Sequence, residues 1–486
     1  MARITRDRLA LYSAALAEKG LRPPVAPPLP LRADRTRAPL SRAQERLFFL
    51  ELYEPGTPVH NDAVAVRIEG ALDELRLWRA FQAVAERHEV LRTAFVLGPD
   101  GPEQHVHAPA EARPVLAARD CAGAGDALAT ARRLAVEEAR RPFALEQAPL
   151  WRATLLRLGP ADALLVVTMH HLVSDGASMG LLFDELAQAY AEPQARRAPL
   201  AAQFGDFAAD ERARGAAPRL ALERDFWRAT LAPARTLEWP ARRGPASRAG
   251  AQVALALDAA GVAELGARAR AAGATSNHWL LATWLAWLGA QSGASAPCTG
   301  FASSLRRRRE LEPLIGFFVE SLPLVVPLAA EEPFAALVAR VRAAAFAAVE
   351  HGTLPFDEIA RSAGATPLAL QAFFSHMHAA IRAPELPGAR TSWSFVDPGV
   401  ARFELALVLH EAPTGLTGFL ELDHGVFAPG SGAELAAGWQ RLLAATLARP
   451  AEPLATLVAA ADLRGTERGA ERRPGRALPP RRAAGA

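Results

Sequence analysis

The chain has 486 residues, half of them hydrophobic, which is enough apolar material for two or three domain-sized lobes. Its formal net charge is +3, but the last 23 residues hold seven arginines and two glutamates, so the preceding body carries −2. A body without excess positive charge is not typical of a nucleic-acid-binding protein, and we expect no nucleic-acid partner.

Membrane insertion and disulfide bonding are also not indicated. Cys121 and Cys298 lie far apart and form no paired spacing, which argues against a disulfide framework or a zinc finger. The basic amino terminus lacks a small-residue cleavage site, and the longest apolar stretch, residues 279–290, is shorter than the roughly 18 residues of a membrane span. We therefore expect a cytoplasmic protein without a membrane partner.

Residues 1–39 are predicted to form a short amphipathic helix and a proline-rich linker. Apolar residues recur at helical spacing before Gly20, and residues 22–30 include five prolines, too many for a helix or a central strand. The body of the protein begins near Leu40.

The first half of the body combines strands and helices. Residues 64–69 alternate between apolar and polar side chains, as in a half-buried strand, and residues 72–86 have the pattern of an amphipathic helix. Residues 151–158 and 163–169 read as neighbouring strands, and the almost wholly apolar second one should be central in its sheet. A helix is predicted again from about residue 178 to 190.

The second half repeats this mixture. Helices are predicted at about 199–231, from 259, from 277, at 333–351 and at 432–448, and strands from 252, from 297, and at 319–328, 369–376, 403–409 and 416–422. Interspersed strands and helices predict an α/β or α+β fold with two lobes, residues 40–215 and 216–460, followed by a disordered basic tail at 461–486.

The strand at 163–169 ends in a histidine pair, within the pattern His170-His171-x-x-x-Asp175-Gly176. Because side chains alternate along a strand, only one imidazole can face a given cleft, and the other must pack or hydrogen-bond inside the protein. The pKa of a histidine lies close to the working pH, so its imidazole can take the proton of an attacking amine during acyl transfer.

The aspartate and the glycine of this pattern have roles of their own. Asp175 can orient the imidazole or pair with a distant cation, and Gly176 leaves room for a substrate or a pantetheine arm and offers an N–H to an oxyanion. On this segment alone, two core histidines followed by a turn remain an alternative. A metal site fits less well, since adjacent histidines on a strand diverge.

Six segments in order along residues 40–457 resemble motifs of the condensation-domain family of nonribosomal peptide synthetases. They are Ser41–Leu50 (SxAQxRLWxL), Arg87–Phe95 (RHExLRTxF), His170–Gly176 (HHxxxDG), Gln203–Ala208 (YxDFA, with Phe204 for tyrosine), Ile315–Val319 (IGxFV) and His351–Asp357 (HxxxPFE, with Asp357 for glutamate). Six ordered matches are far more specific than one.

The resemblance implies two lobes similar to chloramphenicol acetyltransferase, arranged as a V-shaped pseudo-dimer with a tunnel between them. It assigns catalysis to His171 and a structural role to Asp175, with Arg306 as the cation that pairs with it. The local pattern adds Gly176 as a catalytic residue and His170 as a structural residue of the site. The implied enzyme is an acyltransferase that joins a carrier-bound acyl thioester to an amine or alcohol. It needs no cofactor of its own, because the phosphopantetheine arm belongs to the carrier protein.

Departures from the family pattern leave the acceptor open. Glu320-Ser321 stands where the family has Asn-Thr, and Ala177 stands where it has tryptophan. An ester-forming chain release onto a free acceptor and a catalytically idle recruiting domain are the alternatives. An epimerization domain, a heterocyclization domain and a plant-type acyltransferase are disfavoured, because their signatures are absent. Since the sequence contains no adenylation or carrier module, we expect a monomer that acts in trans on a carrier protein.

Overall fold

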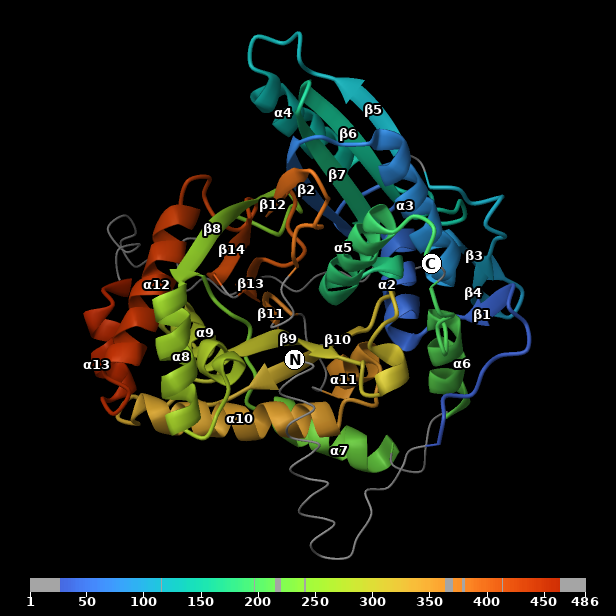
Figure 1. Ribbon diagram of the computed structural model, residues 1–486. Helices are drawn as coiled ribbons and strands as arrows, with labels where there is room; N and C mark the ends of the chain where they lie inside the picture. The colour runs from blue at the N-terminus through green and yellow to red at the C-terminus, as the bar shows by residue number, and fades with distance from the viewer. Residues whose placement is uncertain are drawn as a thin grey trace, which may run out of the picture.

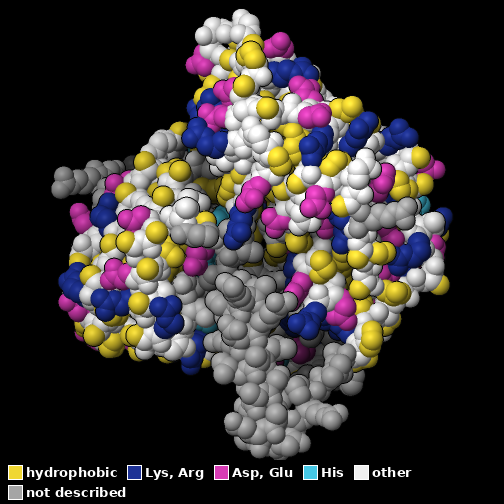
Figure 2. Space-filling view, viewed as in Figure 1, with side chains coloured by type: hydrophobic (Ala, Val, Ile, Leu, Met, Phe, Trp, Pro, Cys, Tyr) yellow, Lys and Arg dark blue, Asp and Glu magenta, His cyan; other side chains and the backbone are white. Residues whose placement is uncertain are grey.

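The computed structural model describes residues 27–463 except 115, 196, 215–219, 240–241, 363–369, 378–380 and 413. The predicted N-terminal helix and the basic tail from residue 464 lie outside the described residues. None of the helices in the described part of the chain is long and apolar enough to cross a membrane. On the face drawn in Figure 2, acidic and basic side chains are interspersed.

The first half of the chain is built on a mixed five-stranded sheet (Figure 1). Its strands, in spatial order, are β12 (Ala389–Phe395), β2 (Asn61–Gly70), β7 (Asp162–His170), β6 (Trp151–Gly159) and β5 (Leu116–Asp120). β7 lies between β2 and β6, and eight of its nine residues are buried. The central strand predicted from this apolar run is therefore confirmed.

Helices cover both faces of this sheet. One face packs with α2 (Arg42–Tyr53), α3 (Glu74–Arg87) and α5 (Gly176–Ala191), and the other with α4 (Ala127–Arg140). The alternation along β2 decides the division, because Val64 and Val66 enter the first core whereas Ala63 and Ala65 enter the second.

The second half is built on a six-stranded sheet that contributes the larger core (Figure 1). Its strands, in spatial order, are β10 (Val319–Val325), β9 (Cys298–Ser304), β11 (Ala372–Met377), β13 (Leu405–Ala412), β14 (Gly415–Asp423) and β8 (Gly250–Asp258). The helices of this half are α7 (Leu220–Leu231), α8 (Ala259–Ala271), α9 (Ser276–Ser292), α10 (Phe334–Glu350), α11 (Phe356–Ser362), α12 (Gly432–Ala448) and α13 (Leu454–Ala460). The buried helix predicted from residue 277 is α9, whose Trp279, Trp284 and Trp287 have no exposed surface.

Short elements complete the fold. A three-stranded sheet consists of β1 (Arg37–Pro39), β4 (Gly101–Val106) and β3 (Thr93–Gly98). The remaining elements are the 3-10 helices η1 (Glu89–Arg92), η2 (His171–Val173) and η3 (Arg309–Leu311), and α6 (Phe204–Ala213). The helical region predicted at 199–231 is thus represented by two helices, α6 and α7, with residues 215–219 between them outside the described part.

The two sheets do not divide at residues 215 and 216, where the sequence analysis placed the lobe boundary. β12 comes from the second half but pairs antiparallel with β2, placing Trp393 opposite Val66. Ile315 and Phe318 also belong to the core of the first sheet. The strand β12 escaped prediction because its residues alternate between partly buried and exposed positions and no long apolar run marks it.

Candidate active site

The segment from His170 to Gly176 joins the end of β7 to the start of α5. The turn is short because η2 takes only three residues, and Asp175 then caps the helix by accepting a hydrogen bond from the Ser178 N–H at 2.7 Å. An aspartate at this position satisfies one of the free N–H groups at a helix start. The sequence thereby fixes the direction of both histidines.

His170 faces the protein interior and is 3% exposed. Its Nδ1 accepts a hydrogen bond from the Leu172 N–H at 3.1 Å, so Nε2 carries the proton and faces Glu51 Oε1 at 3.2 Å. This satisfied imidazole is consistent with the structural role predicted for it.

His171 faces the junction between the two halves. Its Nδ1 donates to the Ser174 carbonyl oxygen at 2.9 Å, which leaves the lone pair on Nε2. That nitrogen receives a hydrogen bond from Arg402 Nη1 at 2.7 Å and lies 3.3 Å from Asp62 Oδ2. The side chain is 17% exposed, so the ring is not sealed from the surface.

Burial favours the neutral form of His171. Burial lowers the pKa of the imidazole, Asp62 opposes this by favouring the charged form, and the Arg402 guanidinium adds to the lowering, so the net pKa lies below its ordinary value. A neutral ring with an unprotonated Nε2 is the form that can accept a proton.

Asp175 and Arg306 lie side by side beneath the histidine segment. Arg306 Nη2 is 3.2 Å from Asp175 Oδ1 and also donates to Ser178 Oγ at 2.9 Å. Asp175 Oδ2 accepts from the Phe318 N–H at 3.0 Å, and the Arg306 guanidinium lies 4.2 Å from the centre of the Phe318 ring. Asp175 thus joins the start of α5 to the segment that leads into β10.

The other motif segments surround this junction. Gln44 Nε2 donates to the Leu172 carbonyl oxygen at 2.8 Å, and His88 Nδ1 accepts from the Ile315 N–H at 3.3 Å. Phe204 packs against Phe318 with ring centroids 4.8 Å apart, and its ring fills the space where a Cβ on Gly316 would lie. Most of the motif residues therefore build the frame that holds the histidine segment.

A family model for the condensation domain matches residues 34–464. The chain belongs to the condensation-domain family. Phosphinothricin tripeptide synthetase PhsC of Streptomyces viridochromogenes is 34% identical over 441 residues, covering 85% of this chain and 40% of that protein. Malpinin synthetase of Mortierella alpina is 31% identical over 403 residues, 80% of this chain and 5% of that protein. The condensation domain thus spans a minor part of these curated relatives.

Solved structures give the same architecture. The X-domain from teicoplanin biosynthesis aligns with a TM-score of 0.73 at 31% identity, over 88% of this chain and 99% of that one. The first condensation domain of the calcium-dependent antibiotic synthetase, in complex with a substrate analogue, aligns with a TM-score of 0.76 at 22% identity, over 87% and 98%. The predicted fold, related to chloramphenicol acetyltransferase, is confirmed.

Gly176 does not present open space in this condensation domain. A Cβ built on it would lie 2.1 Å from the Met377 Sδ, so the methionine at the end of β11 packs directly against the glycine. The space that we expected for a substrate or a pantetheine arm is filled by this thioether. The lack of a side chain instead permits close contact between α5 and the second sheet, and a catalytic role for Gly176 stays a prediction.

Two residues at His171 were missed in the sequence analysis, Asp62 and Arg402. Asp62 is a carboxylate directly before the apolar residues 63–66 of β2, and this position was a signal in the sequence. Arg402 follows β12 and lies 231 positions from His171 in the chain, with no local pattern that predicts the contact.

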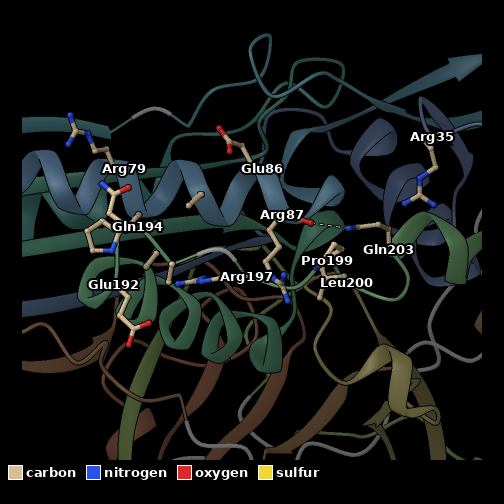
Figure 3. Close-up of a pocket in the computed structure, with 15 residues that line it drawn as sticks. Arg35, Arg79, Glu86, Arg87, Glu192, Gln194, Arg197, Pro199, Leu200 and Gln203 are labelled. Atoms are coloured by element: carbon tan, nitrogen blue, oxygen red, sulfur yellow. Dashed lines mark hydrogen bonds between the residues drawn. The ribbon is translucent and has the colours of Figure 1, made fainter.

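A separate hollow of about 700 Å³ lies between α3 and the segment after α5 (Figure 3). Four arginines line it, Arg35, Arg79, Arg87 and Arg197, and Gln203 closes one side by donating to the Arg87 carbonyl oxygen at 2.9 Å. No residue of the His170–Gly176 segment is among its lining residues. The candidate reaction site is therefore the junction at His171 and not this hollow.

Proposed function

We propose that this condensation domain forms an amide or ester bond between an acyl thioester, carried on the phosphopantetheine arm of a carrier protein, and an amine or alcohol. The main support is the state of His171. Its Nδ1–H is held by the Ser174 carbonyl oxygen, and its unprotonated Nε2 accepts from Arg402 on a side chain that is 17% exposed.

His171 acts as the general base in this proposal. The nucleophile attacks the thioester carbonyl carbon, a carbon–nitrogen or carbon–oxygen bond forms, and Nε2 takes the proton that the nucleophile loses. Collapse of the tetrahedral intermediate breaks the carbon–sulfur bond, and the proton passes to the departing thiolate. No cofactor enters this sequence, since the thioester supplies the driving energy.

Replacing His171 with alanine tests this role. A carrier protein loaded with an acyl group is incubated with the domain and a panel of amines and alcohols, and products are measured by mass spectrometry. We expect a loss of rate of about 100-fold or more, the usual contribution of a general base. His105→Ala is the matched control, because this imidazole contacts Glu103 far from the junction. A rate within a few-fold of the wild type would refute the assignment.

Recruitment of a partner protein is the second candidate function. The X-domain from teicoplanin biosynthesis, in its complex with OxyB, aligns at 28% identity over 89% of this chain. Arg402, which covers Nε2 of His171, is compatible with a site that does not turn over. Recruitment is favoured if the wild type yields no product with any acceptor and if His171→Ala binds the carrier protein as tightly as the wild type does.

A further inference from the structure

Asp62, His171 and Arg402 form a group of three where the two halves meet. Arg402 Nη1 donates to His171 Nε2 at 2.7 Å, and Nη2 of the same guanidinium donates to Asp62 Oδ1. The three side chains are 30%, 17% and 29% exposed, respectively. All of them are therefore partly open to solvent.

Two hydrogen-bond acceptors face each other in this group. Nε2 of His171 carries no proton, because it accepts from Arg402 while Nδ1 donates to Ser174. Asp62 Oδ2 lies 3.3 Å from that nitrogen, and within the described residues no hydrogen-bond donor reaches this oxygen. A lone pair on nitrogen and a carboxylate oxygen so close together favour a ligand that donates to both.

Arg402 is held in place mainly by contacts other than the two acceptors. Its backbone N–H donates to Glu421 Oε1 at 2.9 Å, its carbonyl oxygen accepts from Arg248 Nη1 at 2.7 Å, and its Nε donates to the Val59 carbonyl oxygen at 2.8 Å. Turning the guanidinium away from His171 costs the Nε bond to Val59, because the group is planar and rigid, but it leaves both backbone hydrogen bonds in place. In the present arrangement the guanidinium places a cationic donor where a protonated amine would lie.

We infer that Asp62 and Nε2 of His171 form the binding subsite of a primary amine acceptor, and that Arg402 fills this subsite when no acceptor is bound. The inference rests on the proposed condensation activity for the reaction that follows, but the binding of the amine stands on the geometry alone. An ammonium group has three N–H donors and a neutral amine has two, so either can serve both acceptors at once. A hydroxyl group has one hydrogen and can serve only one of them.

The chemical step balances with an amine. The bound ammonium releases one proton to solvent, and the resulting amine attacks the thioester carbonyl carbon. A carbon–nitrogen bond forms and the carbon–sulfur bond breaks. His171 Nε2 takes a second proton from the nitrogen and returns it to the thiolate, so the products are an amide and a free thiol. Asp62 remains ionised throughout and holds the remaining N–H.

The experiment compares an amine and an alcohol with the same carbon skeleton, n-butylamine and n-butanol. Binding of butylammonium to the full chain is measured by calorimetry without any donor. Turnover is measured separately with acetyl- and octanoyl-pantetheine thioesters, with kcat and KM determined for each acceptor. The variants are Asp62→Asn, Arg402→Met and the double variant. Asp162→Asn and Arg390→Met are the controls, because their ion pairs with Arg67 and Glu69 lie elsewhere on the same sheet.

We expect Asp62→Asn to weaken butylammonium binding, and to lower the ratio of kcat/KM for butylamine over butanol, by about tenfold to 100-fold, the usual effect of losing a charged hydrogen bond. Arg402→Met should lower the KM for butylamine, because the internal occupant is gone. In the double variant this gain should disappear. Unfolding midpoints of all variants show whether a loss of binding or turnover comes from a destabilised fold. The double variant removes both charges of the pair, so it leaves neither of them unpaired.

Two outcomes would overturn the inference. One is an amine-to-alcohol ratio that is unchanged in Asp62→Asn, and the other is an Arg402→Met variant that loses turnover equally with both acceptors. Butylammonium binding that depends on Asp62, in a protein that condenses nothing, would instead refute the proposed function and leave the amine subsite standing. If butylamine is turned over equally well with and without Asp62, the amine subsite is refuted and the proposed function stands.

Discussion

Two aspartate–arginine pairs lie close to the histidine segment, and they differ in almost every physical respect. Asp175 and Arg306 are 2% and 10% exposed, and Asp175 also holds the Ser178 and Phe318 N–H groups. Asp62 and Arg402 are 30% and 29% exposed, and one oxygen of Asp62 has no donor within the described residues. The first pair is closed and the second is open on one side.

This difference separates structural from functional electrostatics. In the first pair both oxygens of the aspartate accept from N–H groups, which α5 and the segment before β10 supply. In the second pair the guanidinium is divided between a carboxylate and the lone pair of His171. A charge pair that leaves an acceptor unused near a reactive nitrogen is able to exchange its cation for a substrate.

Among the variants that test the difference between the two pairs, Arg306→Met should have the largest effect. It leaves the carboxylate of Asp175 buried without its cation, and breaking a buried pair from one side costs about 3–5 kcal/mol. The loss is measured as the change in the free energy of unfolding in urea. Arg309→Met, in the same arginine cluster but on an exposed side chain, should change stability by less than about 0.5 kcal/mol. Equal losses in the two variants would contradict the structural role of the pair.

The closed pair was predictable and the open one was not. Asp175 and Arg306 lie within or beside segments whose order along the chain resembles the family motifs, and local patterns placed the apolar strand β7 and the buried helix α9. The contact between Asp62 and Arg402 joins positions 340 residues apart, through the crossing of β12 into the first sheet. No periodicity within either segment reports such a crossing.

The contact of Met377 with Gly176 is a second one that the local sequence could not predict. It arises because β11 of the second sheet ends over the start of α5, and the sequence of neither segment contains this information. The sequence analysis assigned the close approach at this glycine to a substrate or a pantetheine arm. Only the identity of the approaching group, a protein side chain, required the three-dimensional structure.

Glu320 is a buried carboxylate whose nearby cation, Arg46, is not bonded to it directly. Burial raises the pKa of Glu320 to about 7, although Arg46 lowers it and Glu211 adds to the rise. The side chain is 8% exposed, and Arg46 lies over the Phe356 ring, 4.1 Å from its centre. The carboxyl group therefore holds its proton in the folded protein over a range in which the unfolded chain releases it.

Glu320→Gln should remove this dependence on pH. Because the folded-state pKa is raised, its contribution to stability is complete below pH 4.5 and is lost as the pH rises toward 7. We compare the free energy of unfolding of the glutamine variant with that of the wild type at each pH. This difference should shift in favour of the variant by up to about 3 kcal/mol between pH 5 and pH 8. Urea unfolding at the two values measures this, with the exposed Glu331→Gln as the control. A constant difference between the glutamine variant and the wild type would contradict the assignment.

The smallest expected effect is a shift in the acid side of the pH–rate profile, and it compares the two members of the open pair with each other. The pKa of His171 is lowered by burial, raised by Asp62 and lowered by Arg402. Arg402→Met removes a cation, so the pKa of the imidazole should rise and activity should fall away at a higher pH than in the wild type. Asp62→Asn removes an anion and should move that limb to lower pH.

The opposite signs make this test specific to electrostatics at His171. A variant that merely loosened the junction would change kcat without separating the acid limbs of the two pH–rate profiles. Arg306 is bonded to Asp175 and not to His171, so Arg306→Met should leave the acid limb of the folded fraction where it is in the wild type. Profiles of kcat/KM between pH 5 and 9 decide the matter. Limbs that shift in the same direction in both variants would show that Asp62 and Arg402 do not set the proton affinity of His171.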